Sequence, residues 1–150
     1  ITAERPQIET VSLGVWVNTG AAAESEADNG ISHFIEHMVF KGTKKRNSLQ
    51  ISEDIENVGG ATNAYTSRHF TCFYAKMLKD DLELATDVIC DFITDPTFDA
   101  AEMSKEKEVV VQEIRRRTGR FGIRLLSGSG ISESGIGTHY SGNTRTCARF

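Results

Sequence analysis

The segment His33-Phe34-Ile35-Glu36-His37 contains two histidines one helical turn apart, with a glutamate between them. On a helix with about 100° per residue, His33 and His37 lie within about 40° of each other, and Glu36 lies about 60° to the other side of His33. Two imidazoles one turn apart can bind one ion, and zinc suits imidazole nitrogen together with carboxylate oxygen. Glu36 can accept a proton from a water molecule on that ion. The segment therefore predicts a zinc site with a catalytic base beside it.

The rest of this helix is apolar, which supports a helical reading of the segment. The residues opposite the histidines are Ile31, Phe34, Ile35, Met38 and Val39. One face thus carries imidazole and carboxylate, and the other is expected to pack in the core. A solvent-facing histidine pair with an unrelated helix carboxylate is the alternative, and the five-residue pattern alone leaves it open.

A catalytic zinc site has three protein ligands and one position for water, so a third ligand must come from elsewhere in the chain. A long helix expected over about 99–117 carries Glu106 and Glu113. They are two turns apart, hence on one face and about 10 Å apart along the axis, so only one can reach a given ion. Spacing does not say which, and Glu102 and Glu108 are rivals.

The elements around these residues follow from hydrophobic periodicity and from turn residues. We expect a strand at 11–17, helices at about 30–40 and 49–57, strands near 62–67 and 70–77, a helix from Asp81 to Asp95, and the helix at 99–117. The glycine pair after Asn57 and the Asp95-Pro96 pair are typical helix ends. This order predicts an α+β domain with helices layered on one mixed, largely antiparallel sheet.

Composition excludes some classes of protein. The net charge of −4 argues against nucleic acid as the main partner, and no apolar run approaches the length of a membrane span. Two basic clusters, 41–46 and 115–117, are interpreted as a solvated loop and a helix end. The three cysteines form no CxxC pair, which favours free thiols in a reducing compartment. Bacterial cytoplasm and mitochondrial matrix both fit.

Residues 118–150 differ in composition from residues 1–117. They hold seven of the thirteen glycines but only one acidic residue, Glu133. Glycine and serine at this density favour a flexible segment, so we expect the tail to be poorly ordered. The chain begins with Ile1, and we expect it to be part of a longer protein.

Residues 8–117 resemble the N-terminal domain of the pitrilysin-type inverzincin metallopeptidases. The resemblance is strongest to the processing-peptidase branch, which contains the mitochondrial processing peptidase β-subunit and its bacterial relatives. It rests on residues 30–43, 55–60, 63–68 and 106–114, which include GISHFIEHMVFKGT, IENVGG and NAYTSR. The resemblance implies that Glu113 is the third zinc ligand, and that Glu106 orients one of the ligands. A surface role for Glu106, paired with Lys105 or Lys107, is the alternative.

The stretch Asn63-Ala64-Tyr65-Thr66 resembles the strand to which members of this family add their substrate as a further strand. An ordinary hairpin strand with Tyr65 in the core is the alternative. His69 is interpreted as a surface or hydrogen-bonded histidine, and His139, in the tail, is a still weaker candidate ligand.

The resemblance implies a zinc-dependent endopeptidase that hydrolyses extended peptides or presequences, with a second peptidase half or a partner subunit. Residues 1–117 would then be an incomplete metal-binding domain that by itself cleaves poorly or not at all. Residues 118–150 do not resemble the family. A reading-frame change or a truncated gene product would produce such a tail. The rival function is that of a non-catalytic structural or partner subunit, as found among relatives of these peptidases.

Overall fold

A computed structural model describes residues 1–120 of the chain, with side chains up to residue 116. Its strands are β1 (Thr10–Val17), β2 (Ala61–Thr66) and β3 (Thr71–Leu78), and its helices are α1 (Ile31–Met38), α2 (Ser48–Glu56), α3 (Leu82–Thr94) and α4 (Ala100–Arg120). The α+β prediction is confirmed, and each expected element is present with ends that differ by a few residues. The predicted flexibility of the tail concerns residues that, beyond Arg120, lie outside the described part.

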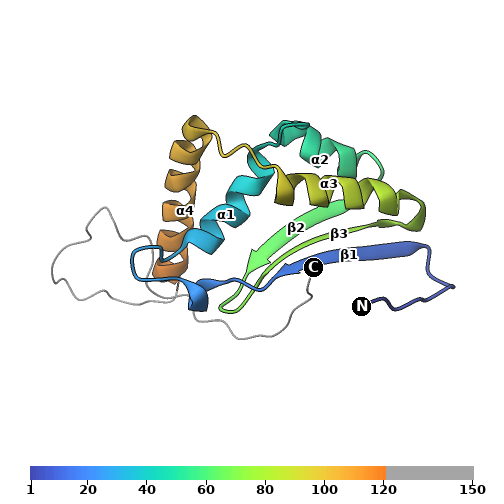
Figure 1. Ribbon diagram of the computed structural model, residues 1–150, viewed down its shortest axis with the longest axis horizontal. Coiled ribbons are helices and arrows are strands. Elements are labelled where there is room, and N and C mark those ends of the chain that lie inside the picture. The colour runs from blue at the N-terminus through green and yellow to red at the C-terminus, as the bar shows by residue number, and fades with distance from the viewer. Residues whose placement is uncertain (121–150) are drawn as a thin grey trace.

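The three strands form one sheet in the order β1-β3-β2, and both pairings are antiparallel. The helices lie on one side of this sheet (Figure 1). Because side chains alternate along a strand, β1 directs Val11, Leu13, Val15 and Val17 to the helical side. There they meet buried residues of β3, α2 and α3, namely Ile51, Ile55, Phe73, Ala75, Met77, Ala85, Val88, Ile89 and Phe92. This is the main core.

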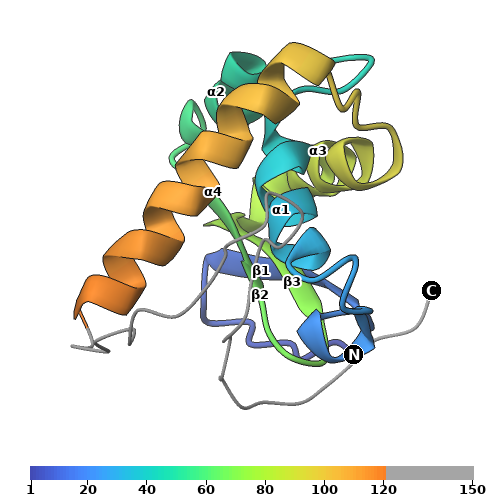
Figure 2. The same ribbon diagram turned by 90° about the vertical axis from the view of Figure 1, so that its left-hand side faces the viewer.

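A second, smaller core joins α1 to α4. It consists of Phe34 and Met38 from α1 with Val110 and, less buried, Ile114 from α4. Figure 1 shows α4 beside α1 at the left-hand end of the molecule, and Figure 2 looks at this end from outside. We call this second core the α1–α4 seam. Because its residues join α1 directly to α4, it determines how the two helices face each other.

The apolar face predicted for α1 is only partly buried. Phe34, Met38 and Val39 are buried as expected, whereas Ile31 and Ile35 are 44% and 39% exposed. The expectation was wrong for these two isoleucines, and Ile35 lines a cavity that separates this face of α1 from the sheet. The end of α2 agrees better with the sequence, since Gly59 has φ +72°, a conformation that glycine adopts at little cost.

No helix among the described residues is both long enough and apolar enough to cross a membrane.

Candidate metal centre

Helices α1 and α4 bring three potential metal ligands together. The Nε2 atoms of His33 and His37 lie 3.3 Å apart. Glu113 Oε2 lies 3.6 Å from Nε2 of His33 and 3.5 Å from Nε2 of His37. The side chains are 21–33% exposed, so solvent can reach the cluster. Two residues of one helix and one distant residue thus converge on one point.

The three separations can be compared with those of hydrogen bonds and of zinc sites. The two N···O separations, 3.5 and 3.6 Å, exceed the roughly 2.7–3.2 Å of a good N–H···O hydrogen bond. In a tetrahedral zinc site with bonds of about 2.0–2.1 Å, neighbouring ligand atoms lie about 3.3–3.4 Å apart. The three edges, 3.3, 3.5 and 3.6 Å, are close to one face of such a tetrahedron. Two imidazoles and a carboxylate are also ligand types that zinc accepts, so the residues fit a zinc ion.

Glu36 differs from the other carboxylates near the site. Its Oε2 atom is buried and has no hydrogen-bond partner among the described residues. On α1 it lies on the side of His33 that faces away from the α4 seam. A buried, unpaired carboxylate oxygen is costly for a folded protein and marks a site where another molecule supplies the partner. Oε2 of Glu36 is therefore available to accept a hydrogen bond or a proton.

The far side of the His37 ring is held by Glu106. Its Oε1 lies 2.9 Å from His37 Nδ1, and its Oε2 lies 2.6 Å from Nζ of Lys41. Burial alone would raise the pKa of Glu106, but the hydrogen bonds from Lys41 and His37 outweigh burial and hold the pKa below its ordinary value. An ionised Glu106 only accepts hydrogen bonds, so Nδ1 of His37 is the donor in this contact, and in the neutral ring the lone pair then lies on Nε2, the atom nearer Glu113.

The structure thus separates the carboxylates that sequence spacing left as equals. Glu113 lies at the two Nε2 atoms, and Glu106 lies at Nδ1 of His37. Glu102 pairs instead with Lys105, and Glu108 is exposed. Surface pairing of Glu106 with Lys105 or Lys107 is wrong, since Glu106 is only 5% exposed and contacts α1.

The start of α1 is held by Glu24, which sequence reasoning missed. Its two carboxylate oxygens accept hydrogen bonds from the backbone N–H groups of Gly30 and Ser32, at 2.7 and 2.9 Å. Burial raises the pKa of Glu24, but these hydrogen bonds outweigh burial and lower the pKa overall. Gly30 has φ +95°, which few other residues tolerate. Glu24 lies six residues before Gly30, the N-cap residue of α1, too far for the usual capping pattern to reveal it.

The predicted substrate strand, residues 63–66, lies in β2 at one edge of the described sheet. The Ala64 N–H donates to Asn63 Oδ1 at 2.8 Å. Tyr65 is 43% exposed and packs edge-to-face on Phe70 and Tyr74, so the alternative with Tyr65 in the core is wrong. Thr66 is buried and its hydroxyl lies 3.5 Å from the carbonyl oxygen of Ser32 in α1. This edge therefore runs close to the helix that carries the histidines.

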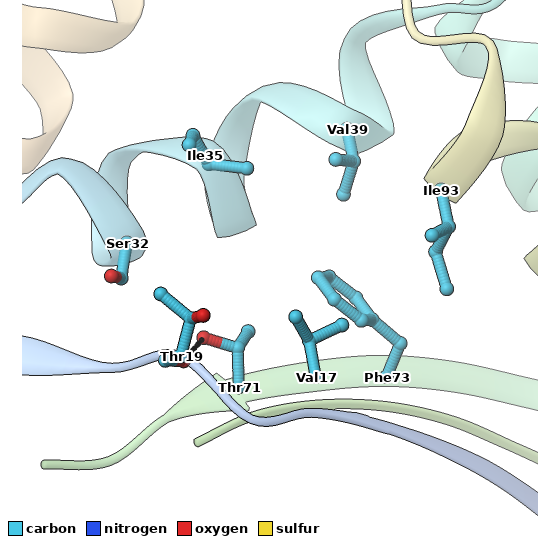
Figure 3. A pocket seen from close by; sticks show the side chains of 8 residues that line it. All are labelled: Val17, Thr19, Ser32, Ile35, Val39, Thr71, Phe73 and Ile93. Carbon is cyan, nitrogen blue, oxygen red and sulfur yellow. Dashed lines mark hydrogen bonds between the residues drawn. The ribbon is translucent and has the colours of Figure 1, made fainter. Parts of the chain in front are cut away.

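A cavity of about 200 Å³ lies on the opposite side of α1 from the histidines. Figure 3 shows Ile35 of α1 and Val39 of the 3-10 turn after it pointing into the cavity, with Val17, Thr71 and Phe73 opposite them on the sheet. Its lining is mostly apolar and includes none of the four residues with metal or proton chemistry. The cavity and the metal centre are thus separate features.

Other candidates from the sequence lie away from the centre. His69 is exposed, and His139 lies outside the described residues. Cys72 and Cys90 are free thiols. Within the first basic cluster, interpreted as a solvated loop, Arg46 is only 14% exposed and forms ion pairs with Asp54, Asp87 and Asp91. That interpretation was wrong for Arg46, because its partners are distant in sequence.

Residues 1–119 match the protein-family model described as "Insulinase (Peptidase family M16)". Among known proteins, the chain is 46% identical over 110 residues to the "uncharacterized zinc protease YmxG" of Bacillus subtilis. The matched region covers 73% of this chain and 27% of that protein. It is 42% identical over 115 residues to the mitochondrial-processing peptidase subunit beta of Rattus norvegicus, covering 77% and 24% respectively.

The fold is also similar to that of a protease from Helicobacter pylori. The two structures superpose with a TM-score of 0.72 at 26% sequence identity, over 75% of this chain and 27% of the other. The chain therefore spans about a quarter of the length of these relatives.

Proposed function

Since the chain belongs to the insulinase family of peptidases, family M16, we propose that it binds one zinc ion through His33, His37 and Glu113 and hydrolyses peptide bonds with Glu36 as the base. The observation that carries this proposal is the triangle of ligand atoms described above. Its two N···O edges are too long for good hydrogen bonds, and all three edges suit a shared ion. The relatives named as a zinc protease and a processing peptidase support the same assignment.

The catalytic step assigns a separate task to each side chain. A zinc ion at this site supplies a Lewis acid that acidifies water and polarises a peptide carbonyl. Glu36 removes the proton from the attacking water with its unpaired Oε2 and then delivers that proton to the nitrogen of the leaving amine. Glu106 holds His37 in the tautomer that leaves Nε2 free for the ion.

For the substrate, we propose an extended peptide or presequence that pairs with β2 through residues Asn63, Ala64, Tyr65 and Thr66. Strand addition fixes the carbonyl groups of a peptide by backbone hydrogen bonds, so affinity depends little on side chains. Two observations support this edge: β2 pairs with one described neighbour only, and it contacts α1. The Ala64 N–H, now bound by the Asn63 side chain, is a donor that a substrate carbonyl could take over.

Because the chain spans about a quarter of its relatives, we propose that full activity needs a second peptidase half or a partner subunit. The rat relative is named as a subunit beta, which supports this requirement. One relative is bacterial and another mitochondrial by name, so we propose the bacterial cytoplasm or the mitochondrial matrix as the compartment.

Zinc content measured on purified protein tests the proposal. Wild type should bind one zinc ion per chain, and Glu113→Ala should bind far less. Glu108→Ala is the matched control, since Glu108 is an exposed glutamate on the same helix, and it should bind like wild type. Equal zinc content in wild type and Glu113→Ala would contradict the ligand set.

Glu36→Gln separates catalysis from metal binding. It should keep the zinc and lose nearly all cleavage of an extended, arginine-bearing peptide, assayed with the remaining peptidase half supplied. Full activity of Glu36→Gln would end the role of Glu36. If the wild type holds no zinc and cleaves nothing, the rival function as a non-catalytic subunit takes its place.

A further inference from the structure

Lys41 makes a contact that the proposed chemistry leaves unexplained. It follows His37 by one helical turn and lies in the short 3-10 turn Val39–Lys41 that extends α1. Its Nζ lies 2.6 Å from Glu106 Oε2, while the other oxygen of the same carboxylate lies 2.9 Å from His37 Nδ1. The Glu106 side chain is 7% exposed and that of Lys41 is 31% exposed. One carboxylate of α4 is therefore held at both oxygens by two residues of α1.

We propose that Lys41 is a positioning residue of the zinc site, which acts through Glu106 to fix the ring of His37. This inference rests on the proposed function, since it assigns Lys41 a part in holding the same ion. Lys41 itself does not touch the ion, the substrate or the reacting atoms. Its effect reaches the site through the chain of contacts Lys41, Glu106 and His37.

The geometry explains why both carboxylate oxygens have to be held. A carboxylate bound at one oxygen can still rotate about its last side-chain bond, and its hydrogen bond to a ring nitrogen then tilts. With Lys41 on Oε2, Oε1 stays directed at Nδ1 of His37. The ring cannot turn without breaking this contact, so Nε2 remains directed at Glu113 and His33. Residues that orient a metal-binding histidine in this way contribute to metal affinity.

An ordinary surface ion pair would not have this effect, and the chain offers one for comparison. Lys105 pairs with Glu102 on α4 at 2.6 Å, but both side chains are well exposed, at 69% and 37%. Such a pair lies within one helix and adds little to stability. The Lys41–Glu106 pair differs because it joins two helices, and because its carboxylate is buried and shared with a candidate ligand.

The test compares zinc dissociation constants in the 150-residue chain, measured by competition with a chromophoric chelator. Glu106→Gln should weaken binding by about 10- to 100-fold, as for other residues that orient a ligand. Lys41→Met should weaken it by about 3- to 30-fold, and Lys41→Arg should restore most of the loss. Lys105→Met is the matched control and should bind zinc like wild type.

Two further measurements distinguish positioning from a general effect on folding. In the Glu106→Gln background, Lys41→Met should cause no further loss of zinc affinity, because the two residues act in series. In the zinc-free protein, the ¹⁵N shifts of His37 should show the Nδ1–H tautomer in wild type and a mixture of tautomers in Lys41→Met. If circular dichroism shows that Lys41→Met is unfolded, Lys41→Gln replaces it.

The outcomes separate this inference from the proposed function. Absence of zinc from the wild type would refute the proposed function and this inference with it. Zinc bound by the wild type and equally tightly by folded Lys41→Met would refute the role of Lys41 alone. Additive losses of zinc affinity in the Lys41→Met, Glu106→Gln double variant would also refute the role of Lys41.

Discussion

The proposed zinc site lies across the seam between α1 and α4, so we expect it to depend on that seam, and Val110 is the residue with which to test this dependence. Val110 is 1% exposed and packs on Phe34 and Met38 of α1. It lies one turn from Glu106 and one turn from Glu113, on the same face of α4. Val110→Ala removes two carbons, at about 0.8 kcal/mol each, and leaves a small cavity, so we expect unfolding free energy to fall by about 2 kcal/mol.

The same substitution should also weaken zinc binding. If the lost packing served only to hold the two helices in the zinc-competent arrangement, the whole 2 kcal/mol would appear in the affinity, a ceiling of about 30-fold. Val88→Ala is the matched control, since Val88 is 0% exposed but lies in the main core between α3 and the sheet. We expect a similar loss of stability from Val88→Ala with no change in zinc affinity.

Both quantities can be measured on the same samples. Urea unfolding of the zinc-free proteins, followed by circular dichroism, gives the free energies of unfolding. Chelator competition without urea gives the zinc dissociation constants of the folded proteins. The reasoning would be refuted if Val110→Ala lost stability and bound zinc as tightly as wild type, or if Val88→Ala weakened zinc binding to the same extent.

Three other predictions follow from the contacts around the site. The lowered pKa of Glu24 means that its ionised form stabilises the fold fully above its ordinary pKa of about 4.5, and that this contribution is lost as pH falls through the lower folded value. Glu24→Gln should therefore cost about 1 kcal/mol of unfolding free energy at neutral pH and less in acid, measured by urea unfolding at several pH values. Arg46→Met should destabilise the fold by about 3 kcal/mol in the same assay, because it removes the charged partner of buried Asp91. Lys45→Met removes an exposed ion pair with Asp87 and should cost much less. Zinc at a hundredfold excess over its dissociation constant should raise the unfolding free energy of wild type by about 3 kcal/mol, as measured by thermal unfolding. A chelator should remove this gain, and Glu113→Ala should not show it.

The local parts of this structure could be predicted from the sequence because they depend on periodicity. The strands, the helices and the clustering of His33 with His37 follow from repeats of two and about 3.6 residues, which neighbouring residues fix. The burial of Phe34 and Met38 followed in the same way. The exposure of Ile31 and Ile35 did not, since an amphipathic pattern shows which residues can be buried but not whether another element covers them.

The long-range polar contacts could not be predicted in this way. The loop at 41–46 reads as a run of basic residues, yet Lys41 binds Glu106, and Arg46 binds aspartates on α2 and α3. Glu24 likewise binds the start of a helix from outside it. In each case the partner is set by the tertiary fold, and the sequence around the charge contains no trace of it.

The spacing of Glu106 and Glu113 shows how the fold resolves an ambiguity that sequence geometry could not. Seven residues on α4 place the two carboxylates on one face, about 10 Å apart, which is too far for one ion to reach both. An imidazole, however, has two nitrogens that point in different directions. His37 lies across the gap, with Nδ1 at Glu106 and Nε2 at Glu113, so the two glutamates meet opposite edges of one ring. The two-turn spacing therefore suits the proposed division of roles, with Glu113 as a ligand and Glu106 orienting His37, because neither carboxylate can reach the other's contact from its own position.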